Sequence, residues 1–260
     1  MHRFIRILPL VAALLFAAGC ASTPNDPTKN WSAQRLYDEG KQALTKGEYA
    51  TAIKHFETLE ARYPYGAYSE QAQLEVAYAY YKDQEMASAI SAAERFIRLH
   101  PTHPNADYAY YLKGLASIDE ERNFLEAYLT DIDLSDRDPK ALRMAYDTFR
   151  ELLRRFPNSK YAEDSRQRMA YLVNALAQGE IHVAKYYFQR GAYVATVNRC
   201  KEVIERYQGT TAVEDALGIQ AKAYKKMGLD LLMNDSLRVL EANFPNSKYH
   251  KEVAKLPAKG

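Results

Sequence analysis

The amino-acid sequence predicts an all-α fold, a right-handed α-solenoid of about five helix pairs, with an insertion in the third pair and a long helix leading the fourth. One unit recurs along the chain, in which an amphipathic helix, a turn and a second helix end on an aromatic-proline pair. The string FPNSKY occurs twice, at 156–161 and 244–249. The closing prolines of the first two units, Pro64 and Pro101, lie 37 residues apart. Such a period is typical of stacked helix pairs, because each pair has an apolar face that only a neighbouring pair covers.

The recurring units resemble tetratricopeptide repeats, which place small and large residues at fixed positions of a helix pair. The first unit fills the Gly, Tyr, Ala, Phe and Pro positions with Gly40, Tyr49, Ala52, Phe56 and Pro64. The fifth unit fills matching positions with Ala221, Tyr224, Gly228, Leu237, Leu240 and Pro245. The small residue lets the two helices approach, the large residue fills the space beside it, and proline ends the second helix.

The N-terminal residues 1–19 predict a lipoprotein signal peptide, cleaved between Gly19 and Cys20. Arg3 and Arg6 make a basic head, an apolar stretch of twelve residues follows, and small residues lead to the cysteine. This stretch is too short to span a bilayer, which takes about 20 apolar residues. Acylation of Cys20 attaches two or more lipid chains, which is enough for stable anchoring. The alternative is a secreted protein in which the cysteine is unmodified.

The rest of the chain divides into five predicted segments. Residues 20–30 are polar, contain two prolines and predict a flexible tether that spans at most about 35 Å. One unbroken helix is expected from about Lys160 to Arg190 within the later repeats. The segments after the tether are the N-terminal repeats 31–118, which would carry a peptide groove, the insertion 119–138, the C-terminal repeats 139–250, which would form the partner-binding half, and a polar tail 251–260.

Composition and motifs exclude several classes of function. Two of the 35 basic residues lie in the signal peptide, so 33 face 33 acidic residues, and no basic stripe indicates nucleic-acid binding. No catalytic motif is present, and Cys200 occupies a packing position, which indicates a buried structural thiol. The acidic run 131–138 lacks the glycine and the final acid of a calcium loop. The sequence therefore predicts a protein that is not an enzyme and that has no metal site and no cofactor.

Tyrosine is the unusual component, with 21 residues in the chain. Most of them are expected to pack between helices. In this type of repeat the first helix of each pair lines a concave surface, and five tyrosines occupy lining positions: Tyr37, Tyr78, Tyr81, Tyr108 and Tyr111. Because tyrosine is rigid and amphipathic, these positions predict a groove for an apolar or aromatic peptide in the N-terminal repeats.

Four longer strings resemble the BamD (ComL/YfiO) family of outer-membrane lipoproteins, namely RYPYGAYSEQAQLEVAYAYYK (62–82), RFIRLHPTHPNADYAYYLKGL (95–115), DLSDRDPKA (133–141) and VAKYYFQRGAYVATVNR (183–199). The resemblance implies a non-enzymatic scaffold of the β-barrel assembly (BAM) machinery, lipid-anchored on the periplasmic face of the outer membrane. It also implies three kinds of partner: the POTRA region of a BamA-like barrel protein, accessory BAM lipoproteins, and the C-terminal signals of unfolded outer-membrane proteins, which commonly end in aromatic residues. Arg199 matches a family arginine at the BamA contact, and Tyr63, Tyr65 and Gly66 match an aromatic loop near the groove.

Two other interpretations share some of these features. A different lipidated tetratricopeptide adaptor, such as a pilotin for pilus secretin subunits, would have the same fold, anchor and location but would lack the strings DLSDRDP and AYVATVNR. A cell-wall enzyme on a helical scaffold would need a separate catalytic domain, and no residues remain to build one. Repeat scaffolds often bind rather than catalyse, but the fold alone does not identify the ligand.

Overall fold

The computed structural model describes residues 26–126 and 139–257, and the side chains of these residues outside 119–126. The predicted signal peptide, its cleavage site at Gly19 and the predicted lipidation site Cys20 lie outside the described residues. Residues 127–138 of the predicted insertion also lie outside them.

The described residues form eleven helices and no strand, which confirms the predicted all-α class. The helices α2 to α11 make five consecutive pairs, and α12 packs against α10. The pairs are α2 (Ala33–Lys46) with α3 (Tyr49–Arg62), α4 (Ala67–Lys82) with α5 (Met86–Leu99), α6 (Ala106–Glu126) with α7 (Pro139–Arg155), α8 (Ala162–Gln189) with α9 (Tyr193–Arg206), and α10 (Ala212–Met227) with α11 (Asp230–Asn243), followed by α12 (Tyr249–Lys255).

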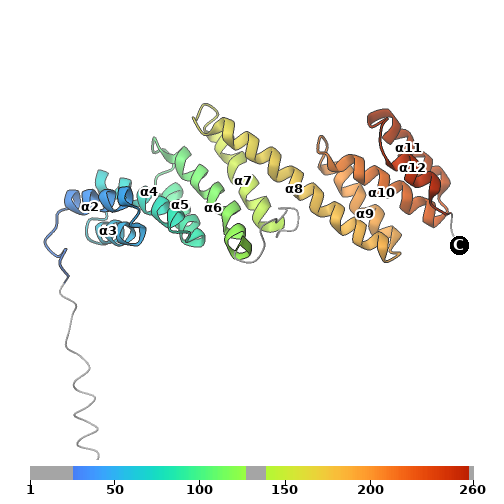
Figure 1. Cartoon of the computed structure of the whole chain (residues 1–260). Coiled ribbons are helices and arrows are strands. Elements are labelled where there is room, and N and C mark those ends of the chain that lie inside the picture. Colours follow the sequence, from blue (N-terminus) through green and yellow to red (C-terminus); the bar gives the residue numbers. More distant parts are fainter. Residues whose placement is uncertain (1–25, 127–138, 258–260) are drawn as a thin grey trace, which may run out of the picture.

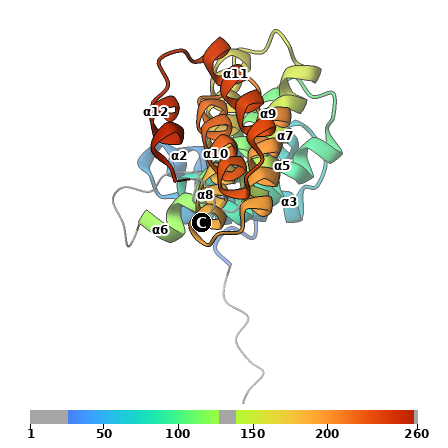
Figure 2. The same cartoon turned by 90° about the vertical axis from the view of Figure 1, so that its right-hand side faces the viewer.

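The pairs stand side by side in an elongated row, with α2 and α3 at one end and α11 and α12 at the other (Figure 1). Viewed from the α12 end, the last pair lies in front and the earlier pairs lie behind it (Figure 2). From α2 to α11, consecutive helices contact one another, and first helices of successive pairs also touch, as α2 does with α4 and α4 with α6. This arrangement is the predicted tetratricopeptide-type solenoid.

In the first pair and again in the third pair, a glycine on one helix lets the other helix of the same pair come close. A Cβ atom added to Gly40 of α2 would lie 2.7 Å from Cε1 of Phe56 on α3, and one added to Gly114 of α6 would lie 2.5 Å from Cζ of Phe149 on α7. Both phenylalanines are fully buried. Each ring therefore lies directly on the backbone of the partner helix, in the place that the glycine leaves open.

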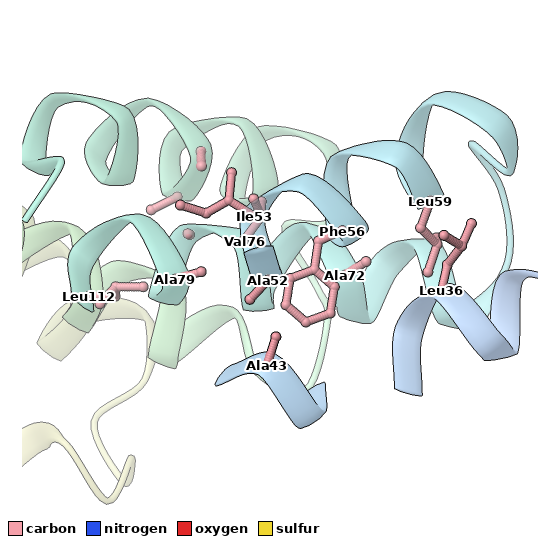
Figure 3. Packing of buried hydrophobic residues seen from close by; sticks show 13 residues of the cluster. Leu36, Ala43, Ala52, Ile53, Phe56, Leu59, Ala72, Val76, Ala79 and Leu112 are labelled. Carbon is pink, nitrogen blue, oxygen red and sulfur yellow. The ribbon is translucent and has the colours of Figure 1, made fainter. Parts of the chain in front are cut away.

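The N-terminal core forms around the first of these contacts. Leu59 of α3 points toward Leu36 of α2, and Phe56 of α3 lies near the small residues Ala43 of α2 and Ala72 of α4 (Figure 3). All five side chains are at most 4% exposed. Burial of such side chains contributes about 25 cal/mol per Å² of apolar surface, so stability comes from these seams between helices.

Helix α8 joins the two halves of the array. It has 28 residues, so it is about 42 Å long. Leu172 and Leu176, near its middle, belong to a core with α6 and α7, and Ile181 and Ala184, further along, belong to a core with α9 and α10. Tyr207, at the end of α9, packs against both cores. The structure confirms the long helix that was predicted between about Lys160 and Arg190.

The structure differs from the predicted segment boundaries at three places. Helix α6 continues through Glu126, so the first part of the predicted insertion is helical. Residues 251–255 belong to α12 and are not a polar tail, because Tyr249 and Val253 lie one turn apart and are both buried. Thr28 is buried although it lies in the predicted tether 20–30.

We expect the substitution Gly114→Ala to destabilise the protein. The added methyl group overlaps the buried ring of Phe149, and overpacking of this kind costs about 1–3 kcal/mol. Chemical denaturation followed by circular dichroism would show the unfolding midpoint at a lower denaturant concentration.

A second substitution serves as the control for this experiment. Phe149→Leu shortens the facing side chain, so the double variant should lose less stability than the sum of the two single variants. An unchanged midpoint for Gly114→Ala alone would show that the pair tolerates a wider separation than this packing requires.

Candidate functional site

A cavity of about 500 Å³ opens between three successive helix pairs. Its wall is built from α4, from α6 and the turn before it, and from the turn before α8. The lining residues are Leu74, Glu75, Tyr78, Pro104, Asn105, Asp107, Tyr108, Lys160 and Tyr161. The volume is within the range of about 300–1,000 Å³ that small-ligand and side-chain pockets occupy.

Tyr108 and Tyr161 form an aromatic wall of this cavity, and Tyr111 supports it from behind Tyr161. The rings of Tyr111 and Tyr161 are stacked, with centroids 4.5 Å apart and an interplanar angle of 16°. The ring of Tyr108 lies 5.5 Å from that of Tyr161. Burial raises the pKa of Tyr108 above its ordinary value, so its hydroxyl stays protonated and can donate a hydrogen bond. Stacked rings are rigid, and they offer a preformed surface to an aromatic ligand.

An ion pair on α8 holds the stacked tyrosines in place. The hydroxyl of Tyr111 donates to Oδ2 of Asp164 at 2.8 Å, and Nε of Arg168 donates to the same oxygen at 2.5 Å. Burial alone would raise the pKa of Asp164, but the hydrogen bonds from Arg168 and Tyr111 outweigh it and lower the pKa. The carboxylate is therefore ionised at neutral pH, and its hydrogen bond fixes the orientation of the Tyr111 hydroxyl.

The polar groups of the cavity carry both signs of charge. Nζ of Lys41 lies 2.6 Å from Oε1 of Glu75, and Oγ of Ser159 donates to Oδ2 of Asp107 at 2.6 Å. The ammonium group of Lys160 lies 5.0 Å from the centroid of the Tyr161 ring. Glu75 is thus paired with a lysine and Asp107 accepts a hydrogen bond from a serine. The exposed Lys160 places a positive charge at the rim of the cavity.

The structure brings only part of the predicted groove together. Tyr78 and Tyr108 line the cavity, and Tyr111 supports it through Tyr161. Tyr37 is half-buried and packs near Phe56.

The other predicted groove residues lie elsewhere. Tyr81 packs against the cores of the first and second pairs. Tyr63, Tyr65 and Gly66 form the turn between α3 and α4 and are not among the residues that line the cavity. Gly66 adopts a φ of 101°, a conformation that favours glycine.

Sequence reasoning missed Tyr161, although its string was noticed. FPNSKY ends on Tyr161 in one copy and on Tyr249 in the other. Tyr249 is buried, donates to Oδ1 of Asp215 at 2.6 Å and lies on Gly218, where an added Cβ would come within 2.0 Å of its ring. Tyr161 instead meets the ring of Tyr111, which keeps it at the cavity. The residue that each tyrosine packs against therefore decides whether its ring is buried in the core or lines the cavity.

A second candidate site surrounds Arg199 on α9. Its Nη1 donates to Oε2 of Glu180 on α8 at 3.0 Å, and Nη2 of Arg143 on α7 lies 4.0 Å from the other oxygen of that carboxylate. The side chain of Glu180 is only 12% exposed, whereas that of Arg199 is 45% exposed. The hydrogen bond to Glu180 raises the pKa of Arg199.

The mostly buried carboxylate of Glu180 thus holds the guanidinium group of Arg199 in place. A guanidinium group has five N–H donors, so a single bond to Glu180 leaves others directed toward the solvent. A shallow hollow of about 290 Å³, which includes Tyr187 and Asn198, adjoins it. This arrangement can receive a carboxylate from a partner.

No group of three or more metal-ligating side chains occurs among the described residues, and no described helix is long and apolar enough to cross a membrane. Cys200 is buried, and burial raises the pKa of its thiol to about 12. A thiol with this pKa is a weak nucleophile at neutral pH, because only the thiolate reacts. The arrangement of Cys200 is therefore that of a core side chain.

Comparison with known proteins identifies the family. The family described as YfiO, outer membrane lipoprotein, matches residues 29–240. The chain is 50% identical over 254 residues to outer membrane protein assembly factor BamD of Neisseria meningitidis serogroup B, covering 97% of this chain and 95% of that protein. This chain belongs to the YfiO (BamD) family. BamD of Vibrio cholerae is 41% identical over 234 residues, which cover 90% of this chain and 95% of that protein.

The YfiO match includes both candidate sites, because it extends from the start of the first pair into α11. BamD of Neisseria gonorrhoeae is likewise similar over nearly the full length, with 48% identity over 251 residues, 96% of this chain and 94% of that protein. Membership of this family replaces the pilotin and cell-wall enzyme interpretations.

We expect Cys200 to resist thiol reagents in the folded protein. Its thiol is buried and its pKa is about 12, so almost none of it is thiolate at pH 8. In a Cys20→Ala variant, which leaves a single cysteine, the aromatic disulfide reagent DTNB should release no colour from the native protein and one equivalent in denaturant. Rapid reaction of the native protein would show that α9 separates from the core on that timescale.

Proposed function

We propose that this chain is a lipid-anchored scaffold subunit of the outer-membrane β-barrel assembly complex, located on the periplasmic face. The relatives that support this proposal are named outer membrane protein assembly factors and are 41–50% identical to it over 90% or more of the chain. The chain accordingly acts in outer-membrane protein assembly and is not an enzyme. The single observation that carries the finer proposal is the tyrosine-lined cavity between three helix pairs.

The cavity is proposed to receive the C-terminal signal of an unfolded outer-membrane protein. An aromatic side chain of the signal fits between Tyr78 and the wall formed by Tyr108 and Tyr161, where ring–ring contacts add about 0.5–1.5 kcal/mol each to the burial of apolar surface. The terminal carboxylate would pair with Lys160 at the rim. Because the cavity spans parts of three pairs, such a ligand also bridges repeats that otherwise touch only their neighbours.

Arg199 is proposed to bind an acidic residue in the POTRA region of a BamA-like barrel protein. Glu180 orients the guanidinium group and is itself almost buried, so the exposed donors of Arg199 point outward. A charge-assisted hydrogen bond to a partner carboxylate is stronger than a neutral one. The groove and Arg199 lie on different pairs, which allows the substrate and the barrel subunit to bind together, while accessory BAM lipoproteins would use the remaining surface.

We expect Tyr78→Ala combined with Tyr161→Ala to weaken binding of a peptide that ends in phenylalanine. Truncation of two central aromatic contacts typically raises Kd by about tenfold or more. Fluorescence anisotropy with a labelled ten-residue peptide would measure the change, and the same peptide ending in serine would show how much of the affinity depends on the ring.

Tyr171→Ala is the matched control for the groove variant. Tyr171 is 58% exposed on α8 and is not among the lining residues of the cavity, so its loss should leave Kd unchanged. Equal affinity of the wild-type protein and the double variant would place the peptide site elsewhere.

Charge reversal at Arg199 should reduce recovery of the POTRA-bearing barrel protein. Loss of one partner in a desolvated charge pair costs about 2–5 kcal/mol. The measurement is a mild-detergent pull-down of full-length Arg199→Glu protein, quantified by mass spectrometry. Arg238→Glu is the control, because Arg238 lies on α11 with a side chain that is 79% exposed. If both variants recover as much barrel protein as the wild type does, Arg199 is not the contact.

A further inference from the structure

Arg62 ties the chain that enters the array to the first helix pair. Its guanidinium group, at the end of α3, pairs with the carboxylate of Asp26, donates to the backbone carbonyl of Thr28, and donates to Oγ1 of Thr28 at 3.0 Å. Thr28 in turn donates to Oδ1 of Asp26, from its backbone N at 2.9 Å and from its hydroxyl at 2.7 Å. These hydrogen bonds lower the pKa of Asp26, so the pair is charged at neutral pH. We call this arrangement the Arg62 clamp.

The clamp shortens the reach of the anchored N-terminus. Only six Cα-to-Cα steps separate Cys20 from Asp26, and a fully extended chain of that length spans about 22 Å. The chain enters the array at the α2–α3 end, which is one extremity of the row of pairs (Figure 1). If Cys20 carries lipid, as the proposed function requires, this end of the first pair therefore lies close to the bilayer.

Aromatic side chains gather at the same end. The hydroxyl of Tyr63 donates to the carbonyl oxygen of Trp31 at 2.9 Å, which places the turn after α3 beside the start of α2. Tyr65, two residues further on, is 91% exposed. The guanidinium carbon of Arg35 lies 4.2 Å from the centroid of the Trp31 ring, and the side chain of Arg35 is 58% exposed. The ring of Tyr65 is too exposed to gain stability from the core of its own protein, whereas the ring of Trp31 stacks on His55 at the edge of the N-terminal core.

We propose that the α2–α3 end of the array, with Trp31, Tyr63 and Tyr65 at its tip, is a membrane-contacting surface that rests among lipid headgroups. Tryptophan and tyrosine favour the membrane interface, because the ring is apolar while its N–H or O–H group reaches water and headgroups. Arg35 supplies a cation for the phosphate groups. The Arg62 clamp holds this tip at the entry point of the chain and so sets the orientation of the first pair on the membrane.

Several observations favour lipid over a peptide as the occupant of this tip. Tyr65 lies on the turn between α3 and α4, and neither Tyr63 nor Tyr65 lines the tyrosine cavity. The short link to Cys20 keeps the tip within reach of the bilayer wherever the rest of the array points.

The experiment uses Trp31, which is the only tryptophan of the chain. Full-length acylated protein is incorporated into phosphatidylethanolamine and phosphatidylglycerol vesicles, with or without bromine atoms on the acyl chains next to the headgroups. Bromine quenches tryptophan only at short range. We expect lower Trp31 emission in brominated vesicles than in the matched unbrominated vesicles.

Three variants test the parts of the proposal, each measured against its own unbrominated control. Asp26→Asn and Arg62→Ala break the clamp, and both should lose most of the quenching. Tyr65→Ser leaves the clamp intact and should lose part of it, because the ring no longer enters the headgroup layer. Tyr171→Ala, which changes an exposed tyrosine on α8, should be quenched as the wild-type protein is.

The outcomes separate this proposal from the proposed anchor. Protein that fails to float with the vesicles overturns lipid anchoring and the membrane contact together. Protein that floats but shows no quenching overturns the membrane contact alone and leaves the scaffold function standing. Equal quenching in the wild type, Arg62→Ala and Tyr65→Ser would mean that neither the clamp nor the aromatic turn positions the first pair.

Discussion

The close approach of the two helices in a pair is the constraint on which the rest of the structure depends. Gly40 and Gly114 have no side chain where Phe56 and Phe149 lie, so each ring packs on bare backbone. This contact sets the spacing and the rotation of the two helices in the pair. The rotation in turn decides which residues of a first helix face the next pair and which face the open side. A functional surface made of first-helix residues is therefore a consequence of packing on the opposite face.

The same rule explains how one motif yields two structures. At the C-terminal end Gly218 leaves room for Tyr249, which covers the last pair and ends the array as a buried cap. In the middle of the array Tyr111 occupies the facing position, so Tyr161 stacks on its ring at the edge of an open cavity. A solenoid needs its terminal apolar face covered, and α12 does this with residues that continue the repeat. The cavity lies where Tyr161 packs on the large side chain of Tyr111 and so cannot cover the helix as Tyr249 does.

Much of this fold could be predicted from the sequence, because each repeat is specified by residues that lie close together along the chain. Period, closing prolines and small residues identify five pairs, and the wide spacing of 51 residues between Pro157 and the matching Gln208 identifies α8. The residues that line the cavity were harder to predict. Tyr78 and Tyr108 were predicted from their positions on first helices, but Tyr161 comes from a turn, and Tyr63 and Tyr65 are not among the residues that line the cavity. Contacts such as that of Arg62 with Asp26 join residues 36 positions apart, and no periodicity reports them.

The unbroken course of α8 has a mechanical meaning. Tyr161 caps its N-terminal end, and Glu180, which holds Arg199, lies 19 residues further along, or about 28 Å at the rise of an α-helix. Apolar seams grip the helix on both halves, so it behaves as a stiff rod. Under the proposed function, a displacement of Arg199 by a bound subunit would be transmitted along this helix to the tyrosine wall. If the cavity and Arg199 bind as proposed, this helix keeps the two binding sites at a constant separation.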